Sequence, residues 1–190
     1  MTINSQKIIH ELRHGLIPFN DIHEFSSNPG IYAIGFTGKF FPFPAGKSIV
    51  GKDEIIYIGK TEKSQKSRDA QTHFKSGKTG SSTLRRSLGA ILRKKLNLEP
   101  IPRSQTEIKV RDYKFIEESE KQLTEWMIEN LSISFFEIDE GKRIIRKSEI
   151  FIIQELRPIL NITHNSSNPY VGMLKELRAK CKKIAKNQID

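Results

Sequence analysis

Two short segments of reversed order, GIY at residues 30–32 and YIG at residues 57–59, constrain this chain more than any other feature. Each lies in an apolar run rich in the β-branched and aromatic residues that strands favour. The turn pair Asn28-Pro29 precedes the first run, and a connection that contains prolines and glycines separates the two. The sequence therefore predicts two sheet strands, 30–36 and 55–59, that each carry one tyrosine.

Helical periodicity and turn residues organise the rest of the chain. Because residues 55–59 are almost continuously apolar, we expect them to form a buried central strand. Pro100 and Pro102 are expected to break the chain. We predict an α/β fold with a small central, mostly antiparallel sheet flanked by helices. Helices are expected at 4–16, 64–76, 83–96, 117–131, 144–156 and from about 170, and extended segments at 107–116 and 133–138.

Composition limits the class of protein. The 190 residues suffice for one domain of ordinary size, and 32 basic against 22 acidic residues give a net charge of +10, which suits a polyanionic partner. A single cysteine, Cys181, excludes an internal disulfide and a cysteine-rich zinc site. The first residues lack the apolar segment of a signal peptide, and no run is long enough to span a membrane. We expect a soluble, cytoplasmic protein that does not bind membranes.

Glu149 is the carboxylate that the pattern singles out. It lies within the apolar stripe of the helix predicted at 144–156, together with Ile145, Ile152 and Ile153. An unpaired buried carboxylate costs several kcal/mol, so such a group is normally paired, protonated or bound to a metal. A partner arginine, a metal ion and a rotated helix that exposes Glu149 are all compatible with this pattern. Glu155 lies on another face of the same helix.

The residues that follow the two tripeptides occur in a distinctive order. Lys60 comes directly after the second tripeptide, Arg68 eleven residues after Tyr57, and much later Glu149, then Pro158 nine residues on and Asn161 three beyond it. This order, together with the tripeptides themselves, resembles the GIY-YIG nuclease family over about residues 28–162. The resemblance implies the fold described above and hydrolysis of a nucleic-acid phosphodiester.

The resemblance also implies roles for individual residues. Glu149 would be the single protein ligand of a divalent metal, Mg²⁺ or Mn²⁺, which takes its other ligands from water and phosphate. Tyr57 would be the general base, with Tyr32 positioning or relaying the proton. Arg68 would stabilise charge on the phosphate in the transition state. Asn161 would hold local structure around the site.

Lys60 matches a lysine found after the second tripeptide in several family members. A phenol has an ordinary pKa of about 10, and Lys60 and Arg68 are the cations expected to help Tyr57 ionise. Family members often place a histidine four residues after the arginine, whereas His73 here comes five residues after Arg68. On a regular helix the two would not share a face. His73 is predicted as a second base or as a phosphate contact, and the alternative is that it simply pairs with Asp69, four residues before it.

A basic segment at residues 75–86 is the predicted DNA-binding surface. Glycines and serines let its backbone approach phosphates, and a helix that begins near residue 83 attracts anions. Phenylalanines in the connection 37–54 either pack beneath it, which we favour, or wedge against bases. The basic residues of the segment are Lys75, Lys78, Arg85 and Arg86, of which either arginine is an alternative to Arg68 as the catalytic cation.

The last segment predicts an amphipathic helix. Its apolar seam is expected to dock on its own domain or on a second copy of the chain, so that a homodimer is one arrangement to test. Its basic flanks would offer charge to DNA. The seam comprises Leu174, Leu177, Cys181 and Ile184, and basic residues such as Lys175, Arg178, Lys182, Lys183 and Lys186 surround it.

We therefore expect an N-terminal helical extension at 1–27, a nuclease-like domain at 28–162 and a basic C-terminal helix at 163–190. The expected function is metal-dependent endonucleolytic hydrolysis of DNA, with no small-molecule cofactor. One alternative is a non-catalytic nucleic-acid-binding protein that retains the nuclease fold. Another is a protein-interaction domain whose basic face is only solvated.

Overall fold

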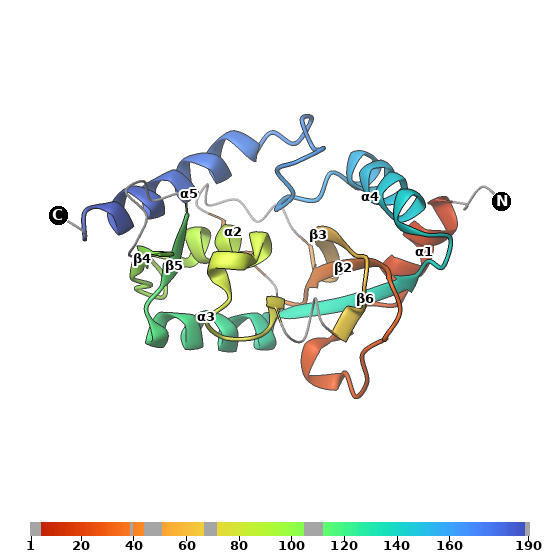
Figure 1. The fold of residues 1–190 in the computed structure, drawn as a ribbon, viewed down its shortest axis with the longest axis horizontal. Coiled ribbons are helices and arrows are strands. Elements are labelled where there is room, and N and C mark those ends of the chain that lie inside the picture. The colour runs from red at the N-terminus through yellow and green to blue at the C-terminus, as the bar shows by residue number, and fades with distance from the viewer. Residues whose placement is uncertain (1–4, 39, 44–50, 67–71, 105–111, 189–190) are drawn as a thin grey trace.

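The computed structural model describes residues 5–38, 40–43, 51–66, 72–104 and 112–188 (Figure 1). In chain order the elements are α1 (Ser5–His14), β1 (Ile17–Pro18), the 3₁₀ helix η1 (Phe19–Asp21), β2 (Gly30–Phe36), β3 (Glu54–Thr61), the 3₁₀ helix η3 (Thr79–Ser81), α2 (Thr83–Leu92), β4 (Pro100–Pro102), β5 (Tyr113–Phe115), α3 (Glu117–Asn130), β6 (Leu131–Glu137), α4 (Lys142–Leu156) and α5 (Val171–Lys186).

The main sheet is antiparallel, with the strand order β1-β6-β2-β3. β2 pairs with β3 so that Tyr32 lies opposite Gly59 and Ile34 lies opposite Tyr57. The register shifts between Ile34 and Gly35, which leaves Ile56 as an extra residue in β3. The predicted α/β class with a mostly antiparallel sheet is confirmed.

β3 carries buried apolar residues, as predicted, but does not lie in the centre of the sheet. It occupies one edge, so the prediction of a central strand is wrong. Its apolar residues are buried because helices cover both faces and because residues 158–161 run along its free edge. There the Leu160 amide donates to the Ile56 carbonyl at 2.9 Å. The segment thus satisfies backbone groups that an edge strand would otherwise expose.

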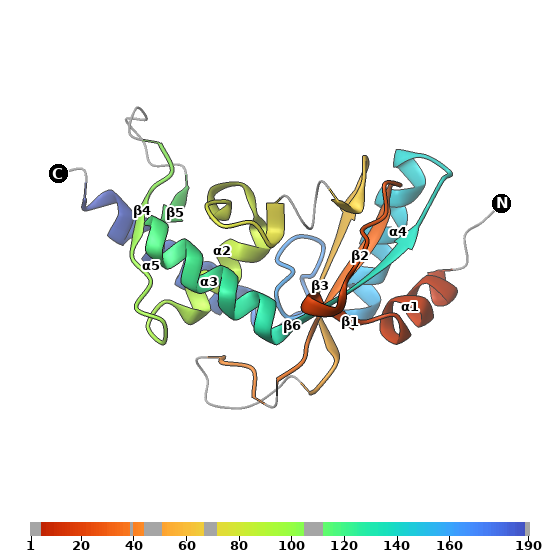
Figure 2. The same cartoon turned by 90° about the horizontal axis from the view of Figure 1, so that it is seen from below.

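Helices cover the sheet on both sides (Figures 1 and 2). α1 and α4 pack on one face, where isoleucines of both helices contact Ile31, Ala33 and Ile58. The opposite face carries Tyr32 and Tyr57 and belongs to a hydrophobic cluster that includes residues of α2, α3 and α5. Alternating side chains therefore divide the core into two layers, as the period of a strand requires.

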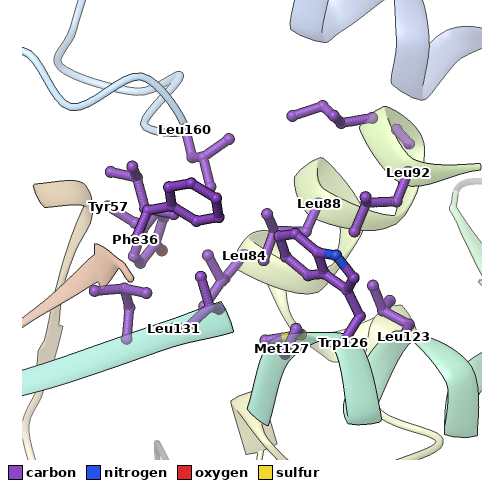
Figure 3. Packing of buried hydrophobic residues seen from close by; sticks show 14 of the residues in the cluster. Phe36, Tyr57, Leu84, Leu88, Leu92, Leu123, Trp126, Met127, Leu131 and Leu160 are labelled. Carbon is purple, nitrogen blue, oxygen red and sulfur yellow. The ribbon is translucent and has the colours of Figure 1, made fainter. Parts of the chain in front are cut away.

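The layer beneath Tyr32 is built from α2 and α3. Trp126 and Met127 of α3 lie across from Leu84 and Leu88 of α2, and Phe36 reaches toward them from the end of β2 (Figure 3). Phe41 and Phe43 belong to this cluster, whereas Phe40 is 75 % exposed. The favoured prediction, that the phenylalanines of the connection pack beneath it, therefore holds for Phe41 and Phe43.

A second, two-stranded sheet forms at the far end of the molecule from α1, where β4 pairs with β5. α5 packs against β4 and α2, and Leu174, Cys181 and Ala185 are fully buried there. The seam of α5 therefore docks on its own chain, the first of the two predicted arrangements. Burial raises the pKa of the Cys181 thiol to about 11, so that the thiol behaves as an apolar core group.

Several local predictions need adjustment. Pro100 and Pro102 were expected only to break the chain, but they are the first and last residues of β4. Each strand of a two-stranded sheet is an edge strand, and edge strands tolerate proline. β1 was not predicted, because two residues are too short to give a periodic signal. Of the helix expected at 64–76, helical backbone is present at 65–66 and 72–73, and residues 67–71 lie outside the described part of the chain.

In the part of the chain that the structure describes, no helix has both the length and the apolar content that a membrane crossing requires.

Arg85, which was predicted to contact DNA, is instead fully buried in α2. Its Nη2 atom donates to Glu120 Oε2 at 2.7 Å, and its Nη1 atom donates to Thr124 Oγ1 at 2.9 Å and to the His73 carbonyl at 3.1 Å. Burial lowers the pKa of Arg85, and the Glu120 carboxylate opposes that effect. The prediction of a DNA contact, or of a substitute catalytic cation, is therefore wrong for Arg85.

Glu120→Gln is expected to lower the free energy of unfolding by about 3–5 kcal/mol, because it leaves a buried guanidinium without its carboxylate. Urea unfolding at neutral pH measures the change. The matched control is Glu125→Gln on the exposed face of the same helix, which should alter stability by about 0.5 kcal/mol or less. Equal losses in the two variants would contradict the role assigned to the Arg85–Glu120 pair.

Candidate active site

A polar pocket of about 470 Å³ lies at the β3 edge of the sheet. It brings together four of the residues predicted from the sequence, namely the two tyrosines, the lysine after them and the helical glutamate. Its lining consists of Tyr32, Tyr57, Gly59, Lys60, Thr61, Glu62, Lys63, Thr72 and Glu149. The pocket therefore joins β2, β3 and α4, which are far apart in the sequence.

The two tyrosines lie side by side on one face of the sheet. Because Tyr32 is opposite Gly59 and Tyr57 is opposite Ile34, they are diagonal neighbours across the β2–β3 pair, with ring centroids 6.2 Å apart. Tyr32 is 0 % exposed and Tyr57 is 7 % exposed. Their rings are thus part of the core, and both residues also line the pocket.

Gly59 has a steric reason to be glycine. A Cβ atom built there would lie 2.2 Å from Tyr32 Oη, closer than any real contact. The Tyr32 phenol therefore crosses over the Gly59 backbone to reach its position. This explains why the first tripeptide supplies the tyrosine and the second supplies the glycine opposite it.

His73 lies behind Tyr32 and is fully buried. Its Nε2 atom is 2.6 Å from Tyr32 Oη, and its Nδ1 atom is 2.7 Å from Ser82 Oγ. Of the two predicted roles for His73, a direct phosphate contact is therefore wrong, because the ring is shielded from solvent. Its ring instead lies against both pocket tyrosines, Tyr32 and Tyr57. Ser82 was not predicted, since only the fold brings it to the histidine.

Glu149 projects from α4 into the pocket and is half-buried. Ile145, Ile152 and Ile153 of the same helix are buried, as predicted, so the carboxylate sits at the border of the apolar stripe. Glu155 is exposed. The pattern thus identified the correct helix face and distinguished the two glutamates.

Lys60 lines the pocket as a member of a small ionic group. Its Nζ atom donates to Glu62, and Lys142 Nζ at the start of α4 lies 3.6 Å from the other Glu62 oxygen. Hydrogen bonding and charge from Lys60 lower the pKa of the Glu62 carboxyl. Glu62 and Lys142 were missed by sequence reasoning, since they belong to no motif.

Asn161 holds the outer edge of β3. Its side-chain oxygen accepts from the Ile58 amide and its nitrogen donates to the Ile58 carbonyl, both at 2.8 Å. The side chain thus makes the two hydrogen bonds that a neighbouring strand would make, at a position between the pocket residues Tyr57 and Lys60. Asn165 extends this support by donating to the Asn161 carbonyl at 3.0 Å. The predicted structural role of Asn161 has this geometry as its physical basis.

The remaining predicted residues lie apart from the pocket or outside the described chain. Arg68 falls within residues 67–71 and Asp69 does too, so their placement is not described. Lys75 is exposed and Lys78 is half-buried. Arg86 is half-buried and pairs with Asp112 at 2.6 Å; burial lowers its pKa, and Asp112 opposes that effect.

The donors around the pocket suit a hard cation. Among the described residues, no three His, Cys, Asp or Glu side chains converge, so a site made wholly of protein ligands is not found there. The pocket instead offers the Glu149 and Glu62 carboxylates together with phenol and hydroxyl oxygens. Mg²⁺ is commonly held by one or two carboxylates and keeps several waters. The residues present therefore fit Mg²⁺ or Mn²⁺.

A family model described as the GIY-YIG catalytic domain matches residues 30–182. Because this match covers most of the chain, the protein belongs to the GIY-YIG family, which is a nuclease family. The resemblance drawn from the two tripeptides is thereby confirmed, and nucleic acid is the implied substrate. No curated protein and no solved structure matches the chain.

Gly59→Ala is expected to lower the free energy of unfolding by about 1–3 kcal/mol, because the new methyl group displaces the Tyr32 phenol from a packed site. Urea unfolding measures the loss. The control is Gly172→Ala in α5, where an added Cβ meets nothing within 4 Å. That change should leave stability equal or slightly higher, since alanine favours helices. A neutral Gly59→Ala would contradict the close approach.

Proposed function

We propose that the protein is a divalent-metal-dependent endonuclease that hydrolyses phosphodiester bonds of DNA. The observation that carries the proposal is the convergence of Tyr32, Tyr57, Lys60 and Glu149 on one pocket. The positions arise from two strands and a helix, and their side-chain types suit hydrolysis of a phosphodiester. The nuclease family of the chain supports the same reaction class.

The metal would be held by Glu149, with Glu62 as a further carboxylate in the lining of the pocket. When bound, a divalent cation supplies Lewis-acid stabilisation of phosphate charge. A single well-placed carboxylate leaves room for the substrate oxygens that such a cation also binds.

The chain's own residues would handle the protons and the charge. Tyr57 accepts the proton of the attacking water as general base. Lys60, which lines the same pocket, would contribute positive charge that favours the ionised form of the phenol. Arg68, by family resemblance, would neutralise charge that builds on the phosphate. Its assignment rests on the sequence, while Thr72 of the same segment lines the pocket.

The DNA would run from the pocket toward the basic surfaces. With Arg85 removed from the predicted set, Lys75, Lys78 and Arg86 remain. The two lysines are the candidate phosphate contacts, because Arg86 is paired with Asp112. α5 adds a longer stripe, since positions i, i+3, i+7 and i+11 of a helix share one flank. Those positions are Lys175, Arg178, Lys182 and Lys186.

A non-catalytic nucleic-acid-binding protein is the second candidate. The basic excess of the chain and the stripe on α5 suit binding alone. The pocket favours the enzyme, because binding needs no carboxylate beside two phenols, and a carboxylate there repels phosphate unless a cation is present.

Glu149→Gln is expected to abolish Mg²⁺-dependent nicking of supercoiled plasmid DNA while DNA affinity stays within about a few fold, because binding draws on other residues. Gel analysis and a fluorescence binding assay measure the two effects. Glu155→Gln, an exposed change on the same helix, is the matched control and should cut at the wild-type rate. Full cleavage by Glu149→Gln would contradict the metal assignment.

The parent protein decides between the two candidate functions. Supercoiled, linear and branched DNA are incubated with Mg²⁺, with Mn²⁺ and with EDTA. Cleavage in the presence of metal and its loss in EDTA support the endonuclease. Tight binding without any cleavage on all three substrates would favour the non-catalytic binder.

Lys175→Gln/Lys182→Gln should weaken DNA binding and reduce the slope of log K against log salt by about 0.9 for each phosphate that the protein no longer neutralises. Substitution is preferable to deleting residues 170–190, because Leu174 and Cys181 are fully buried in the core. Lys7→Gln/Arg13→Gln on exposed positions of α1 is the control and should leave the slope unchanged. Equal slopes in all three proteins would place the DNA elsewhere.

A further inference from the structure

A buried hydrogen-bonded line runs from the pocket to the start of α2. Tyr32 Oη lies 2.6 Å from His73 Nε2, and His73 Nδ1 lies 2.7 Å from Ser82 Oγ. All three residues are 0 % exposed. In such a place each proton must have a definite acceptor, because an unsatisfied buried polar group is costly.

Ser82 determines in which direction the protons of this line point. It is the N-cap of α2, and its oxygen accepts from the Arg85 amide at 3.1 Å. A hydroxyl carries one proton to donate. Among the described residues, the remaining hydrogen-bond partner of Ser82 Oγ is His73 Nδ1. The hydroxyl therefore donates to Nδ1, which must then be the unprotonated nitrogen of a neutral imidazole.

We propose that Ser82 is a positioning residue that holds neutral His73 in the tautomer with its proton on Nε2. His73 then donates to Tyr32 Oη, and the proton of Tyr32 is directed away from the histidine. This excludes neutral His73 as a base that takes the proton of Tyr32, because its unprotonated nitrogen faces Ser82. Of the roles predicted for His73, the second base is thus replaced by a hydrogen-bond donor.

Arg85 holds both Ser82 and His73 in place. Its amide caps onto Ser82, and its guanidinium donates to the His73 carbonyl at 3.1 Å. The guanidinium is in turn held by Glu120 at 2.7 Å. The histidine is therefore anchored through its backbone and through its ring to the same turn of α2. A ring held in this way has one orientation, which a tautomer preference requires.

The consequence for the reaction rests on the proposed function. Tyr32 lines the pocket and, with His73 as the donor, the hydroxyl proton of Tyr32 points away from the histidine. A hydroxyl held in this way can orient the attacking water beside Tyr57, whose ring centroid is 6.2 Å from that of Tyr32. Tyr32 and Tyr57 then have different tasks, donor and base.

The tautomer can be measured directly, without any nuclease assay. Two-bond ¹H–¹⁵N correlation spectra of histidine-labelled protein, recorded well above the ordinary imidazole pKa of about 6.5, distinguish protonated from unprotonated ring nitrogens. His73→Asn assigns the signal among the five histidines of the chain. We expect unprotonated Nδ1 and protonated Nε2. A wild-type His73 signal with the proton on Nδ1 would overturn the proposal even if the protein cleaves DNA.

Variants of Ser82 test the cause of the preference. Ser82→Gly removes the hydroxyl and costs the helix N-cap only a few tenths of a kcal/mol, so the fold should persist by circular dichroism. We expect the His73 signal to lose its single-tautomer pattern in Ser82→Gly and to keep it in Ser82→Thr, which retains a hydroxyl. An unchanged pattern in folded Ser82→Gly would show that another group fixes the tautomer, and would overturn the role of Ser82.

Activity gives the second readout. Ser82→Gly should lower kcat by about 10- to 100-fold, as loss of an outer partner of an active-site group typically does, with KM nearly unchanged. Ser82→Thr should recover most of that loss. A tautomer change without any fall in kcat would overturn the catalytic consequence and leave the proposed endonuclease intact. An inactive wild-type protein would instead refute the proposed function, while the spectra would still decide the tautomer.

Discussion

The antiparallel pairing of β2 with β3 is the constraint on which the site depends. It puts Tyr32 opposite Gly59, and the absence of a side chain at Gly59 lets the phenol cross to His73. Because β3 is the edge of the sheet, side chains from both of its faces can reach one pocket. Glu149 arrives from the helix on one face and the tyrosines from the other. The pocket therefore lies where the edge of β3 meets α4.

That edge has to be kept from pairing with another strand. The side chain of Asn161 bonds the Ile58 amide and carbonyl, and so closes the edge beside Tyr57 without adding a strand. The glutamate and the asparagine of the sequence motif thus both lie at this strand: Glu149 lines the pocket at the β3 edge, and the Asn161 side chain closes that edge.

Positive charge is used in two physically different ways. Arg85 is buried and donates to Glu120 and to the His73 carbonyl, so its charge serves to hold α2, α3 and His73 together in the interior. The lysines of α5 remain exposed on the outside of a helix that docks through an apolar seam. Spacing alone could not separate the two uses, because Arg85 and its neighbour Arg86 look alike in a basic segment. Burial against α3 distinguishes them.

The sequence by itself determined the strands 30–36 and 55–59, the face of Glu149 and the family, because these follow from alternation, helical period and motif spacing within short stretches. It did not determine that β3 lies at the edge of the sheet. Nor did it determine that Ser82, Arg85 and Glu120 are linked to Tyr32 through hydrogen bonds that pass by way of His73. Those groups meet through contacts between segments far apart in the chain, for example that of Tyr32 with His73. Only tertiary packing decides them, since periodicity reports which face of an element is apolar and not what that face will meet.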